Sequence, residues 1–153
     1  MTHYTLELLK DTADGEALLK LAGKEQQQLK KQRLNLELQK DDYMDTYKKL
    51  TADLDLQQIS LTIDNEVIER LPEGNYKDEK IDHQAHLVYK IHELKKRLSH
   101  HTPQKLLQIE LMLERVHKDM EITSAFIAVI ETHMKSLQKA LPPGEAANGE
   151  ERL

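Results

Sequence analysis

The chain has 153 residues, a mass of 17.8 kDa and a net charge of −5, from 22 Lys and Arg against 27 Asp and Glu. It contains five Gly, four Pro, five Tyr, one Phe, and neither Trp nor Cys. Because sheet proteins rely on aromatic residues and frequent turns, this composition argues against a sandwich or a barrel. Without Cys the chain has no disulfide framework, no thiolate metal site and no Cys nucleophile.

The first ten residues lack a basic region followed by a long apolar core, so we expect no signal peptide and a cytoplasmic protein. No stretch approaches the roughly 18 consecutive apolar residues of a membrane-spanning helix. The clusters of Lys and Arg have acidic residues nearby, which is typical of solvated helix faces. We therefore expect neither nucleic acid nor a membrane as partner. Residues 51–75 are the most acidic part, with one basic and six acidic side chains.

A short helix over residues 5–11 is the first expected element. A turn follows at residues 12–15, with Asp14 as the N-cap of the next helix. That helix is predicted over residues 16–71, a span without Pro in which Gly23 costs about 1 kcal/mol relative to Ala. A helix of this length does not fit a compact sphere, so we predict a single elongated domain over residues 1–141.

The helix over residues 16–71 carries two series of residues at heptad spacing, the second interrupted by polar side chains. The first series is Ala22, Leu29, Leu36, Tyr43, Leu50 and Gln57, and the second is Leu19, Gln26, Arg33, Lys40, Tyr47, Leu54, Leu61 and Ile68. The end nearest Pro72 is therefore expected to be the better packed part of this helix.

A turn at residues 72–77 is the clearest break, because Pro72 ends a helix and Gly74 and Asn75 favour turn conformations. Asp78 is the expected N-cap of a helix that runs to His100. Its apolar residues predict one broad buried face: Ile81, Ala85, Leu87, Val88, Ile91, Leu94 and Leu98. A second turn, at residues 101–103, places Thr102 as N-cap and Pro103 at the first position of the last helix.

The last helix, predicted over residues 103–141, has the most regular pattern in the chain. Its seam alternates spacings of three and four through Leu106, Ile109, Leu113, Val116, Met120, Thr123, Ile127, Ile130, Met134, Leu137 and Leu141. This is the a/d pattern of a coiled coil. Further apolar residues widen the stripe beyond what a two-stranded seam needs: Leu107, Leu111, Ile122, Phe126 and Val129. Residues 142–153 are polar and begin with two Pro, so we predict a disordered tail.

The fold class is predicted to be all-α, with two packings open. In a long antiparallel helical hairpin or coiled coil, the second and third helices are nearly collinear and return along the first. In an uneven three-helix bundle, the turn at residues 101–103 is a true reversal. The bundle covers the wide stripe within the chain, whereas the hairpin covers it only by dimerising into a four-helix arrangement. We favour the hairpin that self-associates.

Glu79, His83 and His86 lie one and two turns apart on one helix face, so they are candidate ligands for zinc or iron. Their position at a charged helix start favours a polar surface instead. Glu114 and His117 have the Glu-x-x-His spacing of di-iron bundles. Such a site needs two of these motifs, and the chain has this one alone, with Val116 rather than His117 in the seam.

Other residues that often carry chemistry give no site. His100 and His101 are expected at a polar helix end. Tyr43, Tyr47 and Tyr89 are candidates for stacking on nucleic-acid bases, but Tyr43 and Tyr47 occupy seam positions, so core or interface packing is expected for them. A catalytic serine needs a base and a turn that presents its hydroxyl. The four serines of this chain lie in helical patterns instead: Ser60, Ser99, Ser124 and Ser136. No phosphate-loop, dinucleotide, hydrolase or metalloprotease motif is present.

The sequence therefore predicts a non-enzymatic structural or scaffolding coiled-coil protein, with no catalytic, cofactor-binding or metal-binding residues. It is expected to act through helix-mediated self-association, as a homodimer or a higher homo-oligomer, or through a protein partner that covers the poorer part of the helix over residues 16–71. Two alternatives stay open. One is a metal-binding helical bundle assembled on dimerisation, and the other is a helical protein associated with nucleic acid.

Overall fold

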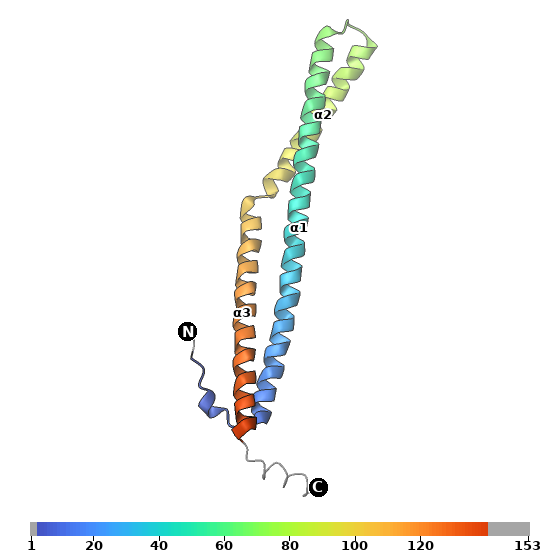
Figure 1. The fold of residues 1–153 in the computed structure, drawn as a ribbon. Coiled ribbons are helices and arrows are strands. Elements are labelled where there is room, and N and C mark those ends of the chain that lie inside the picture. The colour runs from blue at the N-terminus through green and yellow to red at the C-terminus, as the bar shows by residue number, and fades with distance from the viewer. Residues whose placement is uncertain (1–2, 141–153) are drawn as a thin grey trace, which may run out of the picture. The chain divides into compact units, whose positions relative to one another are not determined.

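The computed structural model describes residues 3–140, and within that range the chain is all-α (Figure 1). A one-turn 3₁₀ helix, η1, spans Leu6–Leu8, and three α-helices follow: α1 at Thr12–Arg70, α2 at Asn75–His100 and α3 at Pro103–Ala140. No strand occurs among the described residues, so the predicted fold class is confirmed. The predicted tail, residues 142–153, lies outside the described residues, as does Leu141.

Two helix starts differ from the prediction. α1 begins at Thr12, so the turn predicted at residues 12–15 is wrong. Its N-cap is Asp11 rather than Asp14, because Asp11 Oδ1 accepts a hydrogen bond of 3.0 Å from the Ala13 N–H. α2 begins three residues before the predicted cap, directly after Gly74. Gly74 has a φ of 158°, which side chains disfavour and glycine adopts freely.

The chain divides into two compact units, which are described separately. The first comprises Met1–Asn35 and Met112–Leu153, and the second comprises Leu36–Leu111. The second unit thus contains the rest of α1, all of α2 and the first residues of α3.

In the second unit, α2 returns antiparallel along α1 (Figure 1). His83 of α2 contacts Asp64. Further along the chain, the Tyr43 hydroxyl donates a hydrogen bond of 2.7 Å to the Thr102 carbonyl. At the start of α3, Lys40 Nζ lies 3.3 Å from Glu110 Oε1. From α2 to the start of α3, the contacting residue of α1 thus changes from Asp64 to Tyr43 and then to Lys40. Residues 103–111 therefore run in the same direction along α1 as α2 does. The turn at residues 101–103 is a bend, as in the hairpin, and not the reversal of a three-helix bundle.

Pro103 explains this bend. Its ring lacks an N–H and clashes with the helical conformation of the residue before it. α2 closes with a hydrogen bond of 3.0 Å from the His101 N–H to the Leu98 carbonyl. α3 then starts at Pro103, as predicted from Thr102-Pro103.

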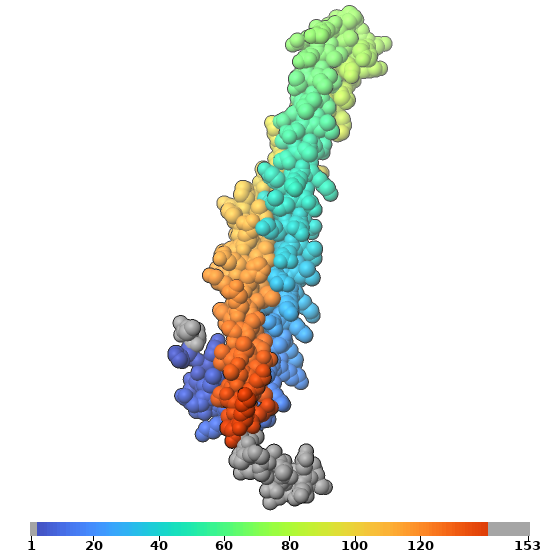
Figure 2. All heavy atoms as spheres, in the orientation of Figure 1, coloured from blue at the N-terminus to red at the C-terminus, as the bar shows by residue number. Residues whose placement is uncertain are grey.

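In the first unit, the C-terminal part of α3 packs on the start of α1. Gln26 Nε2 donates a hydrogen bond of 2.9 Å to Ser124 Oγ. Residues 3–11 lie on the flank of α3, where Figure 2 shows them in dark blue against the red end of that helix. Tyr4 packs edge-on against Phe126 with ring centroids 5.2 Å apart, and His133 Nε2 donates a hydrogen bond of 2.8 Å to the Leu9 carbonyl. This N-terminal segment is a neighbour of α3 that the sequence pattern did not predict.

The predicted seams supply the buried apolar residues, but in α1 these are Ala22, Leu29 and Leu36, in its N-terminal half. The expectation that the end of α1 nearest Pro72 is the better packed part is therefore wrong, since Leu54, Leu61 and Ile68 are only half-buried. The buried apolar residues are Ala22, Leu29, Leu36, Leu87, Ile91, Leu94, Leu113, Val116, Ile130 and Met134.

The buried face of α2 is narrower than predicted, so the prediction of a broad buried face is wrong. Ile81, Ala85 and Val88 are exposed, because one neighbouring helix covers only a narrow stripe.

Gly15 and Gly23 lie in the same helix and differ in what surrounds them. A Cβ on Gly15 would lie 2.7 Å from Met134 Sδ and 2.8 Å from Met134 Cγ, whereas nothing lies within 4 Å of a Cβ on Gly23. We expect Gly23→Ala to raise the free energy of unfolding by about 0.5–1 kcal/mol, since Ala is the better helix former. Gly15→Ala should lower it instead, by about 1 kcal/mol, because the buried Met134 has to move. Urea unfolding measures both, and equal stabilisation would contradict the close packing at Gly15.

Candidate functional site

The candidate metal ligands do not converge. His83 turns toward α1 and contacts Asp64, while Glu79 and His86 are exposed on α2. Among residues 3–140, no group of three His, Asp or Glu side chains is close enough to hold a metal ion. Glu114 and His117 are also exposed, with Val116 buried between them in the seam.

Asp64 is the polar residue that the structure adds to the core. It is 5% exposed and occupies a seam position of α1, between Leu61 and Ile68. His83 Nδ1 donates a hydrogen bond to Asp64 Oδ2, and Lys80 Nζ lies 3.9 Å from Asp64 Oδ1. The first heptad series of the prediction stopped at Gln57, and one further repeat of seven reaches Asp64. The signal for this buried carboxylate was therefore present in the sequence.

A mainly apolar hollow of about 440 Å³ lies beside the bend. It is lined by Tyr43, Met44, Tyr47, Thr51, Leu98, His101, Pro103 and Leu106. The ring of Tyr43 lies 5.0 Å from that of His101, centroid to centroid. Tyr47 is 44% exposed at this hollow, so it does not pack in the core of its own chain. The interruption of the helix before Pro103 leaves the space beside Tyr47 unfilled.

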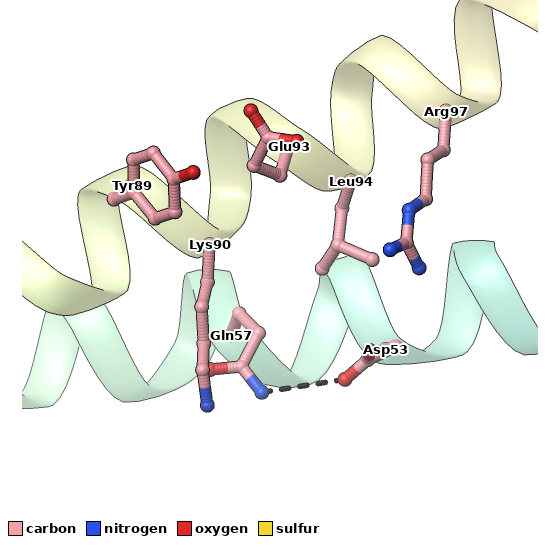
Figure 3. A pocket seen from close by; sticks show the side chains of 7 residues that line it. All are labelled: Asp53, Gln57, Tyr89, Lys90, Glu93, Leu94 and Arg97. Atoms are coloured by element: carbon pink, nitrogen blue, oxygen red, sulfur yellow. Dashed lines mark hydrogen bonds between the residues drawn. The ribbon is translucent and has the colours of Figure 1, made fainter.

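A second hollow of about 420 Å³ lies between α1 and α2, and Figure 3 shows its seven lining side chains. Gln57 Nε2 donates a hydrogen bond of 3.3 Å to Asp53 Oδ1 there. Charges of both signs surround it, from Asp53, Lys90, Glu93 and Arg97. Tyr89 lines this hollow and Tyr43 lines the one at the bend, so these two tyrosines do not form one stacking surface.

An apolar line runs along the outer face of α1. This outer stripe consists of Ala52, Leu56, Ile59 and Ile63, at spacings of four, three and four. Leu56, Ile59 and Ile63 are 59%, 58% and 54% exposed. A shallow hollow of about 430 Å³ follows Ile59 and Ile63 and is bordered by Asp55 and Glu66. The residues that α1 turns toward α2, such as Leu54 and Leu61, lie on its other side. The sequence interpretation missed the outer stripe.

None of the helices within residues 3–140 is long and apolar enough to cross a membrane. The chain matches no protein-family model, no curated protein and no solved structure.

Proposed function

We propose that the chain is a non-enzymatic structural or scaffolding protein that works by packing its helices against another copy of itself. The outer stripe of α1 supports this proposal. Its three large aliphatic residues are more than half exposed and are spaced like the anchors of a helix that binds a second helix. A contiguous exposed apolar patch is a common mark of an interaction surface.

The contacts of His133, a histidine that lies among hydroxyl groups, support a non-catalytic role for that residue. His133 borders a hollow with Thr132 and Ser136. However, its Nε2 donates to the Leu9 carbonyl, and the Thr132 hydroxyl donates to the Ala128 carbonyl. His133 is thus used to hold the N-terminal segment, whereas a catalytic base would face the hydroxyl that it activates. Binding of a different protein and a cytoplasmic location stay predictions from the sequence.

Static light scattering over a range of concentrations tests the proposal. We expect a mass of at least twice the 17.8 kDa of the chain at micromolar to millimolar concentration. A mass of 17.8 kDa over the whole range would contradict self-association.

A further inference from the structure

The spacing of the outer stripe continues beyond its apolar residues at both ends. Lys49 and Asp45 extend it toward the N-terminus, and Glu66 and Arg70 extend it toward the C-terminus, still at spacings of three and four. All four charged residues are exposed, as are the four apolar residues. Read along α1, the line is acidic, basic, four apolar residues, acidic and basic.

This order is complementary to itself when a second copy runs in the opposite direction. In that register Leu56 lies opposite Ile59, and Ala52 lies opposite Ile63. Lys49 then lies opposite Glu66, and position 45 lies opposite position 70, which pairs an aspartate with an arginine. A two-fold axis repeats each pair, so one contact surface serves both copies.

Other registers lose this match. A parallel pairing places each charged residue of the line beside its own copy, and like charges opposite each other disfavour association. An antiparallel shift by one heptad places Glu66 opposite Leu56, or Lys49 opposite Ile59, and so covers a charge with an aliphatic side chain. The charges therefore select one direction and one register, as they do in coiled coils.

The chain's own C-terminal residues are a poorer match for the same surface. Residues 141–153 carry three Glu and one Arg, and the outer stripe already lies in the most acidic part of the chain.

On the flank of the line, the antiparallel register also brings Lys48 of one copy within a turn of Glu69 of the other. Both residues are exposed.

We propose that two copies of this protein associate through the outer face of α1, residues 45–70, as an antiparallel two-fold pair. This inference rests on the proposed self-association and specifies its surface, direction and register. Each α1 then uses two seams, one for α2 of its own chain and one for α1 of the other copy.

Ile59→Lys tests the apolar centre. It places a lysine opposite Leu56 at two symmetric positions, and we expect the dissociation constant of the dimer to rise on the order of 100-fold. Because Ile59 is exposed within its own chain, the helix content measured by circular dichroism should not change. Leu38→Lys is the matched control. Leu38 is an exposed leucine of the same helix that lies outside residues 45–70, so this variant should dimerise like the unchanged protein.

Charge reversal tests the register. Lys49→Glu and Glu66→Lys should each weaken the dimer by about 10-fold, because each puts like charges opposite each other at both ends. Mixing the two variants should restore association, since every end pair of the mixed dimer is again of opposite charge. Sedimentation equilibrium of each variant and of the equimolar mixture gives the constants.

Three results would contradict this proposal. If the unchanged protein dimerises and Ile59→Lys dimerises equally well, another surface is used, and the proposed function stands without this inference. If the mixture associates no better than its components, the antiparallel register is wrong. A protein that is monomeric throughout would overturn the surface and the proposed function together.

Discussion

Replacing Ile130 by Ala should lower the free energy of unfolding by about 2–5 kcal/mol, the range for a large aliphatic residue removed from a packed core. Ile130 is 2% exposed and is the largest fully buried side chain among the described residues. It lies in the seam of α3 that packs on the start of α1 in the first unit. Removing three methyl or methylene groups there leaves a cavity that the surrounding helices fill only in part.

Ile122→Ala is the matched control for this prediction. It is the same substitution in the same helix, two turns earlier, but Ile122 is 59% exposed. We expect a change within about 0.5 kcal/mol, as for most surface substitutions. Urea unfolding of the two variants gives the comparison. Similar losses in both would mean that α3 packs through a different face from the one described.

Asp64→Leu should raise the free energy of unfolding by about 1–3 kcal/mol. The substitution removes the cost of taking the Asp64 carboxylate out of water, and replacing buried charged groups by apolar residues is often stabilising. The partners do not become buried orphans, since the side chain of His83 is 52% exposed and that of Lys80 31%. A leucine at this position would extend the apolar seam between Leu61 and Ile68. Calorimetry should show a higher Tm, and a lower one would contradict this account.

His83→Ala should have the opposite effect, lowering the free energy of unfolding by about 1–3 kcal/mol. It removes the hydrogen-bond donor and leaves the buried Asp64 with Lys80, whose Nζ is 3.9 Å away. In the Asp64→Leu background the same change should be nearly neutral. This double-mutant cycle separates the interaction of His83 with Asp64 from the other contacts of His83. Equal losses in both backgrounds would show that the contact with Asp64 is not what matters.

The helices and their seams could be predicted because each depends on local spacing. Leu113, Val116 and Met134 are buried as their alternation of three and four requires. The direction of the chain after His100 could not be predicted in the same way. Thr102-Pro103 ends one helix and starts another whether the chain bends or reverses. Only long-range contacts such as that of Lys40 with Glu110 distinguish a bend from a reversal.

The contacts of the N-terminal segment were beyond the reach of sequence patterns for a related reason. Tyr4 with Phe126 and Leu9 with His133 join residues more than one hundred positions apart, without any periodicity to link them. Asp64 and the outer stripe are different cases, because both follow from heptad counting. Asp64 was missed because the first heptad series was not continued beyond Gln57. The outer stripe was missed because α1 was read for one seam only.

The break before Pro103 also affects how the backbone opens. Helical hydrogen bonds break and re-form mainly from helix ends, since an end residue gives up one bond whereas an interior opening needs several. α2 and α3 meet at such ends in the middle of the sequence, at His101 and Pro103, whereas α1 has no end between Thr12 and Arg70. Transient fraying can therefore begin beside Tyr43 in the second unit. The hydrogen bond from the Tyr43 hydroxyl to the Thr102 carbonyl holds the residue between the end of α2 and the start of α3 against α1, and so opposes this fraying.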